Sequence, residues 1–542
     1  MNKFIFVSGG VCSSLGKGVA ASSLGALLEG RGLNVRMIKC DPYINVDAGT
    51  MSPYQHGEVY VTDDGAETDL DLGNYARFTA SPLSRANSIT TGQVYDSVIR
   101  KEREGRFLGR CVQVIPHITD EIKSRILAAA REDPNTDVVI IEIGGTVGDI
   151  ESIPFLEAAR QMIHESGKTN AISVHLTLIP EVAGGELKTK PTQHSVKAMQ
   201  EMGIQPDVLV CRAPVMLDDA TCRKIALFCN VDPEAVFTSC NVDTTIYEIP
   251  IIFFNQKLDQ VVLNKMGVES RHANLDPWYF MMKKFAARNG KVCIGIVGKY
   301  MELHDAYKSV YEALFHAGLE CGVEVELVKI DSSGLEEKEN PGAVLETVDG
   351  ILVPGGFGQR GINGMVKAAS WARKNGVPYF GICLGMQIMV MDWGRNVLGW
   401  EDADSTEFNQ DSKHPVVSLL EEQIDVKNYG GTMRLGKSET MAIEGTRIYA
   451  AYGNRQIWER HRHRYEFSNK YRKEMSESGL AIAALTPDGS LVECVEWPNH
   501  PWGLGVQFHP EFKSKPTAAA PLFRDFIAAV KERKMGGGPA PR

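Results

Sequence analysis

Short, largely apolar and mostly continuous runs that alternate with helical stretches are the feature that most constrains the fold of this chain. A strand with one face in water alternates apolar and polar side chains, whereas continuous runs indicate strands buried on both faces. Such strands belong to parallel sheets that lie between layers of helices. The runs lie at residues 4–7, 35–38, 138–143, 172–178 and 208–210, and again at 292–297, 323–330, 351–353, 379–382 and 504–508. The sequence therefore predicts the α/β class.

The length of the chain predicts two domains of this class. At 542 residues, 43% hydrophobic and 23% charged, it exceeds what one ordinary core accommodates. From about residue 265 to residue 290 the strand pattern gives way to charged and aromatic helical sequence. We predict an N-terminal domain over residues 1–265, a linker over 266–290, a second domain over 291–534 and a disordered tail over 535–542. Each domain is expected to hold a mostly parallel sheet flanked by helices.

The net charge and the hydropathy pattern argue against two classes of partner. A formal net charge of -10 disfavours nucleic acid, whose phosphate backbone is held by basic surfaces. No apolar run approaches the ~20 residues needed to cross a bilayer, so no membrane span is expected. The eleven cysteines contain no CxxC pair and fit no common zinc spacing, which predicts reduced thiols and a cytoplasmic protein.

A glycine-rich loop connects the first apolar run to the first helix. Gly10 opens it, and Lys17 lies near its end between Gly16 and Gly18. Glycines let backbone N–H groups turn towards an anion, and the helix N-terminus adds a favourable dipole. The usual phosphate loop has one residue fewer between its glycines, and a Ser or Thr after the lysine. A tight strand-to-helix turn is the alternative, but the order of strand, loop, lysine and helix favours phosphate binding.

Two carboxylates could replace the missing hydroxyl as ligands of Mg²⁺, which prefers one or two carboxylates together with phosphates. Glu142 interrupts the apolar run at 138–143, where a carboxylate is costly unless it is paired or binds a metal. It also lies near the end of a strand, where ligands gather in open α/β sheets. Asp71 belongs to an acidic turn and, taken alone, is equally consistent with a solvated residue.

The second domain carries a candidate nucleophile. Cys383 follows an apolar run and is flanked at ±2 by Gly381 and Gly385, which matches a sharp strand-to-helix turn. At a helix N-terminus a thiolate is stabilised for nucleophilic attack. His509 ends another apolar run and supplies a base, and Glu511 can hold its imidazole in the required tautomer. A buried structural cysteine and an unrelated histidine are the alternative, which the coincidence of all three elements disfavours.

Five longer segments carry a family resemblance. They are residues 9–18, 40–47, 57–59, 142–152 and 188–193. In this order they resemble the CTP synthase family, and the resemblance extends to about residue 530. The Cys, His and Glu set of the second domain resembles class I glutamine amidotransferases. The resemblance implies a P-loop amidoligase domain fused to a glutaminase domain, in a cytoplasmic enzyme of pyrimidine biosynthesis.

The resemblance also implies a set of binding residues. For ATP these are Ser14, Leu15, Gly16, Lys17, Gly18, Val19, Lys39, Asp71 and Val242, and for Mg²⁺ they are Asp71 and Glu142. For UTP and the product CTP they are Ser13, Asp149, Ile150, Glu151, Lys188, Thr189, Lys190, Pro191, Thr192, Gln193 and Lys224. For glutamine they are Gly356, Leu384, Gly385, Met386, Gln387, Glu407 and Arg464. Residues 240–242, on the adenine side, read Cys-Asn-Val where many members carry a charged pair at the first two positions.

The reaction implied by the resemblance has two halves. Cys383 attacks the glutamine amide and releases ammonia. In the first domain ATP phosphorylates UTP at C4, and ammonia then displaces the phosphate. The resemblance further implies GTP as an activator, CTP as a feedback inhibitor, and a homotetramer that in some members stacks into filaments.

Two other functions stay open at this point. Another P-loop amidoligase with a glutaminase domain, such as an enzyme that amidates cobyrinic acid, would have the same two domains. The basic loop at 188–193 favours a triphosphate substrate over a carboxylate-bearing macrocycle. A non-catalytic P-loop assembly protein with a relic amidotransferase domain is disfavoured by the intact set of Cys383, His509 and Glu511.

Overall fold

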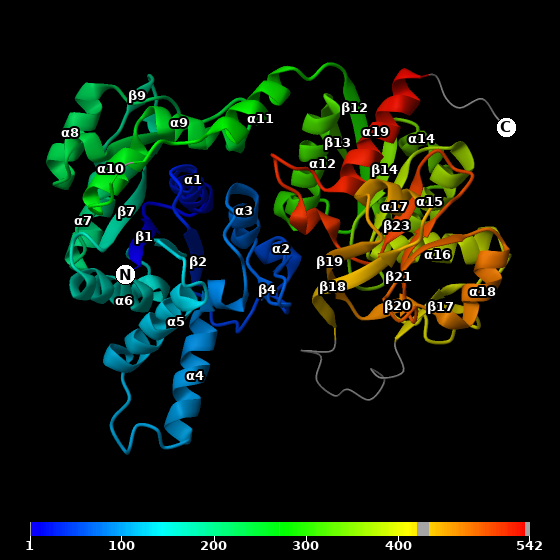
Figure 1. The fold of residues 1–542 in the computed structure, drawn as a ribbon, viewed down its shortest axis with the longest axis horizontal. Coiled ribbons are helices and arrows are strands. Elements are labelled where there is room, and N and C mark those ends of the chain that lie inside the picture. Colours follow the sequence, from blue (N-terminus) through cyan, green and yellow to red (C-terminus); the bar gives the residue numbers. More distant parts are fainter. Residues whose placement is uncertain (1, 270, 420–432, 537–542) are drawn as a thin grey trace. The chain divides into compact units, whose positions relative to one another are not determined.

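The computed structural model describes residues 2–269, 271–419 and 433–536, and it divides into two compact units (Figure 1). Unit 1 is Met1–Thr50 with Asp71–Met282, and unit 2 is Met51–Leu70 with Lys283–Arg542. Residues 51–70 therefore pack with the C-terminal half of the chain, although the residues on both sides of them belong to unit 1. The sequence pattern predicts no such exchange.

Unit 1 is built on a seven-stranded sheet in which every neighbouring pair is parallel. Across the sheet the order is β11 (Val236–Cys240), β10 (Val208–Ala213), β7 (Ala171–Leu178), β1 (Lys3–Gly9), β6 (Val138–Ile143), β2 (Val35–Asp41) and β5 (Ser88–Thr90). Every residue of β2 and β6 is buried, as expected for strands of a parallel sheet that is covered on both faces.

Helices pack against this sheet (Figure 1). Helix α1 (Lys17–Gly30) follows the glycine-rich loop and buries the apolar stripe of Ala20, Leu24, Leu27 and Leu28. The other α-helices of the unit are α3 (Asp71–Phe78), α4 (Thr91–Arg103), α5 (Thr119–Arg131), α6 (Ile153–Ser166), α7 (Lys190–Glu201), α8 (Asp219–Cys229), α9 (Ile249–Asn255) and α10 (Leu258–Lys265), with α11 (Asp276–Ala286) at the boundary.

Unit 2 is built on a nine-stranded mixed sheet. Its order is β13 (Glu324–Asp331), β12 (Lys291–Gly298), β14 (Gly350–Val353), β15 (Tyr379–Ile382), β23 (Gly503–Val506), β22 (Val492–Glu496), β21 (Ala481–Leu485), β18 (Arg434–Ala442) and β19 (Gln456–His463). Neighbours from β13 to β23 are parallel, and the pairs beyond β23 are antiparallel.

The remaining elements of unit 2 flank this sheet or form a small second sheet. Beyond residue 290 the helices are α12 (Lys308–Cys321), α13 (Ser332–Glu336), α14 (Gly342–Leu345), α15 (Ile362–Asn375), α16 (Leu384–Asn396), α17 (Arg447–Tyr452), α18 (Asn469–Glu477) and α19 (Pro521–Met535), and residues 51–70 add α2 (Pro53–His56). The small sheet consists of β16 (Asp404–Ser405), β17 (Pro415–Leu419) and β20 (Tyr465–Phe467).

The structure contains a strand at each predicted apolar run, and the α/β class is confirmed. The run at 504–508 is strand only as far as Val506. The antiparallel half of the second sheet was not predicted. Of the predicted tail, Met535 still belongs to α19 and Gly536 follows it, while residues 537–542 lie outside the described part of the chain. Among the residues that the structure describes, no helix has the length and apolar character needed to cross a membrane.

We expect the ion pair between Arg31 and Asp259 to be important for the stability of unit 1. Arg31 Nε and Asp259 Oδ2 are 2.7 Å apart, and the side chains are 7% and 0% exposed. Replacing Asp259 with alanine removes the carboxylate from a buried guanidinium. We expect the free energy of unfolding of this unit to fall by about 3–5 kcal/mol, as measured by chemical denaturation.

The matched control is Asp96→Ala. Asp96 pairs with Arg100 on α4 at 2.5 Å, with the side chains 54% and 68% exposed. Exposed pairs of this kind contribute little, so the control should unfold within about 0.5 kcal/mol of wild type. Equal losses in the two variants would contradict a special role for the buried pair.

Candidate functional site

Cys383 occupies a sharp turn between β15 and α16. Its backbone angles are φ 53° and ψ -101°, a conformation that residues with a side chain rarely adopt. A Cβ on Gly381 would lie 2.4 Å from the carbonyl group of Gly385, and a Cβ on Gly385 would lie 2.1 Å from the carbonyl oxygen of Val353. Only glycine therefore fits at both flanking positions. The sulfur lies at the N-terminus of α16, where negative charge is stabilised.

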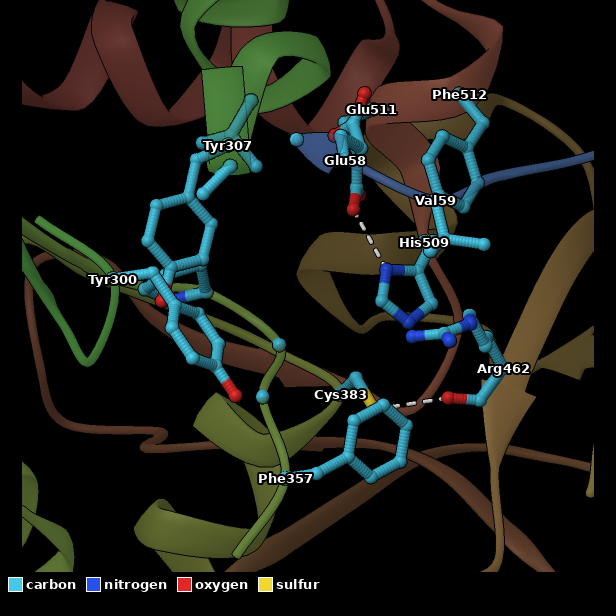
Figure 2. A pocket seen from close by; sticks show the side chains of 16 residues that line it. Glu58, Val59, Tyr300, Tyr307, Phe357, Cys383, Arg462, His509, Glu511 and Phe512 are labelled. Carbon is cyan, nitrogen blue, oxygen red and sulfur yellow. Dashed lines mark hydrogen bonds and ion pairs between the residues drawn. The ribbon is translucent and has the colours of Figure 1, made fainter. Parts of the chain in front are cut away.

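His509 and Glu511 face this turn from the segment that follows β23. His509 Nδ1 lies 2.7 Å from Glu511 Oε1. A Cβ on Gly355 would lie 2.9 Å from His509 Cε1 and 3.6 Å from Cys383 Cβ, so the imidazole and the cysteine adjoin the same small gap. Figure 2 shows the imidazole between the Glu511 carboxylate and Cys383.

The charge state of His509 follows from these neighbours. Burial alone would lower its pKa, but the Glu511 carboxylate, followed by Cys383, outweighs burial and raises the pKa to about 10. A protonated imidazole beside the sulfur stabilises negative charge on the sulfur. The arrangement thus favours a thiolate and imidazolium pair.

The three side chains line a pocket of about 80 Å³ in unit 2 (Figure 2). Cys383, His509 and Glu511 are only 4%, 8% and 5% exposed. The other residues lining the pocket are Gly57, Glu58, Val59, Tyr300, Ala306, Tyr307, Val310, Pro354, Gly355, Gly356, Phe357, Arg462 and Phe512. The pocket is small and mostly covered, so it shields reactive groups from bulk water.

Part of this pocket comes from residues 51–70, whose elements are α2 (Pro53–His56), β3 (Tyr60–Val61) and β4 (Glu67–Thr68). The carboxylate of Glu58 accepts hydrogen bonds from the backbone N–H of Ser309 at 3.1 Å and from its Oγ at 2.5 Å. Arg460 Nε donates to Asp63 Oδ1 at 2.6 Å. Further links are Arg460 to Tyr60 OH, Arg462 to Glu67 and Lys437 N to Asp63 O. The packing of residues 51–70 against the C-terminal half of the chain was not predicted from the sequence.

The residues predicted to bind glutamine gather around the same turn. A Cβ on Gly356 would lie 3.4 Å from Leu384 Cδ2, which places the Gly356 loop beside the first residue of α16. Gly385, Met386 and Gln387 continue that helix and are buried. Gln387 Nε2 donates to the carbonyl oxygen of Tyr465 at 3.0 Å.

The charged side chains in this region are those of Glu407, Arg464 and Lys299. Glu407 Oε1 accepts from Gly358 N at 2.8 Å. Burial raises the pKa of Glu407, while the Gly358 N–H, Lys299 and Arg464 act in the opposite sense. Lys299 Nζ donates to the carbonyl oxygens of Phe357, at 3.2 Å, and of Gly358, and burial lowers its pKa to about 8. Lys299 was not predicted, although its place directly after β12 is where ligands collect in such sheets.

In unit 1 the glycine-rich loop has an irregular backbone. Ser14 and Gly16 have φ 60° and φ 88°, Ser13 is exposed, and Leu15 is buried. Lys17, Gly18 and Val19 begin α1. Lys17 Nζ donates to the carbonyl oxygen of Gly145 at 2.7 Å, and burial lowers its pKa.

Lys39 brings the two predicted metal ligands together. Its Nζ pairs with Asp71 and with Glu142 Oε1, the latter at 3.2 Å, and Asp41 Oδ1 lies 3.6 Å away. Tyr75 OH donates to Glu142 Oε2 at 2.5 Å. Burial and the charge of Asp71 raise the pKa of Glu142, whereas Lys39 outweighs burial and lowers the pKa of Asp71. The carboxylates of Asp41, Asp71 and Glu142 thus surround one ammonium group, with the Glu142 side chain 1% and the Asp71 side chain 21% exposed.

The basic loop at 188–193 leads into α7. Lys188 Nζ pairs with Glu186 at 2.6 Å, and both side chains are largely exposed. Lys224 on α8 lies close enough to help Lys188 lower the pKa of Glu186. Lys190 Nζ lies 5.6 Å from the centre of the Phe228 ring. Thr189 precedes α7, Pro191 is in its first turn, and Thr192 and Gln193 follow.

Two further predicted groups lie at carboxyl ends of strands in the same sheet. Asp149 precedes a short 3-10 helix, η3 (Ile150–Ser152), in the loop after β6, and Ile150 is 81% exposed. Glu151 is also exposed. Val242 follows β11 and is half-buried, and Arg212 donates to the carbonyl oxygen of Cys240 beside it at 3.1 Å.

Two separate stretches of the chain match known protein families. Residues 3–268 match the family described as CTP synthase N-terminus, and residues 302–529 match glutamine amidotransferase class-I. A CTP synthase of Hydrogenobaculum sp. (strain Y04AAS1) is 54% identical over 527 residues, 97% of each chain. One from Geobacter sulfurreducens is 54% identical over 98% of this chain and 99% of its own.

The chain belongs to the CTP synthase family. It is therefore a glutamine-hydrolysing ligase that forms a C–N bond, aminating UTP to CTP with ATP and glutamine as the other substrates. The predicted family and enzyme class are confirmed, and the cobyrinic-acid type of amidoligase is not favoured. A solved structure described as Trypanosoma brucei CTPS glutaminase domain with bound acivicin has 40% sequence identity and a TM-score of 0.42, covering 44% of this chain and 94% of that one.

Glu511→Gln should change how the stability of unit 2 depends on pH. The pKa of His509 is about 10 in the folded protein and about 6.5 in an unfolded chain. Its protonation therefore contributes stability that is fully present below about pH 6.5 and is lost as the pH rises through about 10. Because the variant lacks the carboxylate that raises this pKa, its deficit in thermal midpoint should be largest near pH 6 and shrink towards pH 10.

Glu477→Gln on α18 is the control, since Glu477 is 66% exposed and pairs with Lys473 at 3.8 Å. Its thermal midpoint should follow wild type at every pH. A deficit in Glu511→Gln that stays constant across this range would contradict the assigned charge state of His509.

Proposed function

We propose that unit 2 releases ammonia from glutamine at Cys383. The sulfur attacks the amide carbon, and His509 holds the thiol proton and delivers it to the departing nitrogen. Water then hydrolyses the thioester with His509 as the base. Glu511 orients the ring through the 2.7 Å contact at Nδ1. Backbone N–H groups of the Gly356 loop and of Leu384 receive the negative oxygen of each tetrahedral intermediate.

Glutamine is oriented by groups on both sides of the pocket in this proposal. Arg464 receives the α-carboxylate, for which a planar guanidinium is suited, and Glu407 receives the α-ammonium group. The charge of Arg464 acts to lower the pKa of Glu407, which supports a shared site. The start of α16 supplies the remaining contacts through Leu384, Gly385, Met386 and Gln387.

Unit 1 carries out the ligase half of the reaction in this proposal. The loop from Ser14 to Val19 holds the ATP phosphates, Lys17 and Lys39 neutralise them, and Val242 contacts the adenine. UTP is bound by Ser13, Lys224 and the loop Lys188, Thr189, Lys190, Pro191, Thr192 and Gln193. Phosphorylation at C4 creates a leaving group that ammonia displaces. Ammonia must arrive as NH₃, since ammonium has no free electron pair.

Asp71 and Glu142 suit a divalent cation. Their carboxylates lie around one lysine, with Asp41 beside them, and carboxylate oxygens are the ligands that Mg²⁺ prefers. We assign Mg²⁺ to these two residues. When bound, it would neutralise charge on the ATP phosphates, and Lys39 would remain beside it as a second cation.

Regulation and assembly are proposed on family membership. GTP would activate the glutaminase step, and CTP would inhibit at a site that includes Asp149, Ile150 and Glu151. A homotetramer that can stack into filaments fits the exposure of large apolar side chains in unit 1, where Leu108 is 88%, Ile150 81% and Ile44 80% exposed. All eleven cysteines are free, which fits a cytoplasmic location.

The observation that carries the mechanism is Cys383 at positive φ opposite the His509–Glu511 pair, and Cys383→Ala tests it. The substitution should abolish glutamine-dependent CTP formation. With ammonium chloride at about pH 8 or above, where more NH₃ is present, CTP formation should stay close to wild type, because ATP, UTP and NH₃ do not require the thiol. Both activities can be followed by CTP absorbance.

Two outcomes would contradict the division of labour. Loss of both activities in a folded Cys383→Ala protein would refute separable half-reactions. Retention of glutamine-dependent synthesis would remove Cys383 as the nucleophile.

The metal assignment is tested by Asp71→Ala and Glu142→Ala. Either variant should lose ammonia-dependent CTP formation, because the ATP phosphates would lack their cation. Glutamine hydrolysis by unit 2 should persist, which serves as the internal control for folding of that unit. Near-normal synthesis with an unchanged magnesium optimum in both variants would contradict the assignment.

A further inference from the structure

Ser8, His175 and Ser195 form a buried hydrogen-bonded chain in unit 1 that the mechanism above does not use. Ser8 Oγ lies 2.9 Å from His175 Nδ1, and His175 Nε2 lies 2.8 Å from Ser195 Oγ. The three side chains are 2%, 0% and 7% exposed. Ser8 and His175 are opposite each other on the parallel strands β1 and β7, and Ser195 is on α7.

The two ends of this chain adjoin two different candidate nucleotide loops. Ser8 lies two residues before Gly10, which opens the phosphate loop, and Ser195 lies two residues after Gln193, which ends the basic loop. The phosphate loop also packs directly against α7. A Cβ on Gly10 would lie 1.7 Å from Ser195 Oγ and 3.1 Å from His175 Nε2. The first glycine of the phosphate loop therefore rests on the serine that the histidine holds.

His175 is suited to a fixed role rather than a titrating one. Burial, and to a smaller extent the charge of Lys17, lowers its pKa to about 3, so the imidazole is neutral at physiological pH. A neutral imidazole has one N–H donor and one acceptor nitrogen, and the two serine hydroxyls engage both. Removing either hydroxyl leaves a buried ring nitrogen without that partner, which is more costly than the hydrogen bond alone.

We propose that His175 is a positioning residue that fixes the ATP phosphate loop and the UTP loop against each other. A disturbance at either serine should then change the binding of both nucleotides. This inference rests on the assignment of the two loops under the proposed function. Thr192 Oγ1 also ties α7 to β7, through Thr177 Oγ1 at 3.0 Å and the carbonyl oxygen of Leu178 at 3.1 Å. Loss of the histidine link should therefore leave α7 folded and alter only its fit to the phosphate loop.

Ammonia-dependent CTP formation by Ser8→Ala and Ser195→Ala tests the proposal without involving unit 2. Each substitution should raise the KM for ATP and the KM for UTP together, by about 3- to 10-fold for the loss of one hydrogen bond. Ser173→Ala is the matched control. Ser173 lies on the same strand two residues before His175, is 1% exposed, and its Oγ has no hydrogen-bond partner among the described residues. Both KM values of the control should stay within about twofold of wild type.

A double variant and a shape-matched pair separate positioning from general loss of packing. Ser8→Ala with Ser195→Ala should be little worse than either single variant, because one break already uncouples the loops. His175→Asn can replace Nδ1, and His175→Gln can replace Nε2, but neither amide reaches both serines, so both should raise both KM values. Effects confined to ATP for Ser8→Ala and to UTP for Ser195→Ala would overturn the proposal. Additive effects in the double variant would also overturn it.

Lys188→Ala tests the assignment of the basic loop to UTP separately from the role of His175. Lys188 is exposed and pairs with Glu186, outside the buried chain. Its loss should raise the KM for UTP alone, by roughly 10- to 150-fold for a charge-assisted phosphate contact. If it raises the KM for ATP instead, the proposed loop assignment is wrong, while the joint effects of the two serines still decide the role of His175.

Discussion

The backbone of Cys383, held at φ 53° between two glycines, is the constraint on which the rest of unit 2 depends. The strands β14, β15 and β23 pack closely around this turn, so no side chain fits at the two residues that flank it. Cys383 N donates to the carbonyl oxygen of Val506 at 2.7 Å, which fixes the end of β23 beside the turn. His509 and Glu511 follow that strand end, so the same packing that strains the nucleophile also delivers its base.

Unit 1 is also built on parallel strands, but its proposed role is to bind nucleotides. In the proposed function its ligand-binding groups include Lys39, Asp71 and Glu142. Lys39 and Glu142 lie on neighbouring parallel strands, Asp71 begins α3, and both carboxylates pair with Lys39. In the proposed function, the phosphates and Mg²⁺ would contact these charged groups. Lys17 would turn from the Gly145 carbonyl to the phosphates. In our proposal the neutral His175 has a separate role, which is to fix the backbone of the ATP phosphate loop and of the UTP loop.

The sequence predicted the features that depend on local pattern. Continuous apolar runs identified the parallel strands, glycines at ±2 identified the turn at Cys383, and long motifs identified the family. Features that depend on distant partners were missed. Residues 51–70 dock through Arg460 and Glu58 to positions hundreds of residues away, and β18 has a polar sequence in which only Gly436, Thr440 and Ala442 are buried. Lys299 was missed because one buried lysine after a strand carries no spacing signal.

The most direct test of the account is labelling with an electrophilic glutamine analogue, followed by peptide mass spectrometry. The protein has eleven cysteines, all free, so selectivity is informative. We expect one adduct per chain on Cys383, blocked by glutamine, in a protein that still makes CTP from ammonia. Labelling of another cysteine at an equal rate, or a Cys383 adduct that leaves glutamine-dependent synthesis intact, would contradict it.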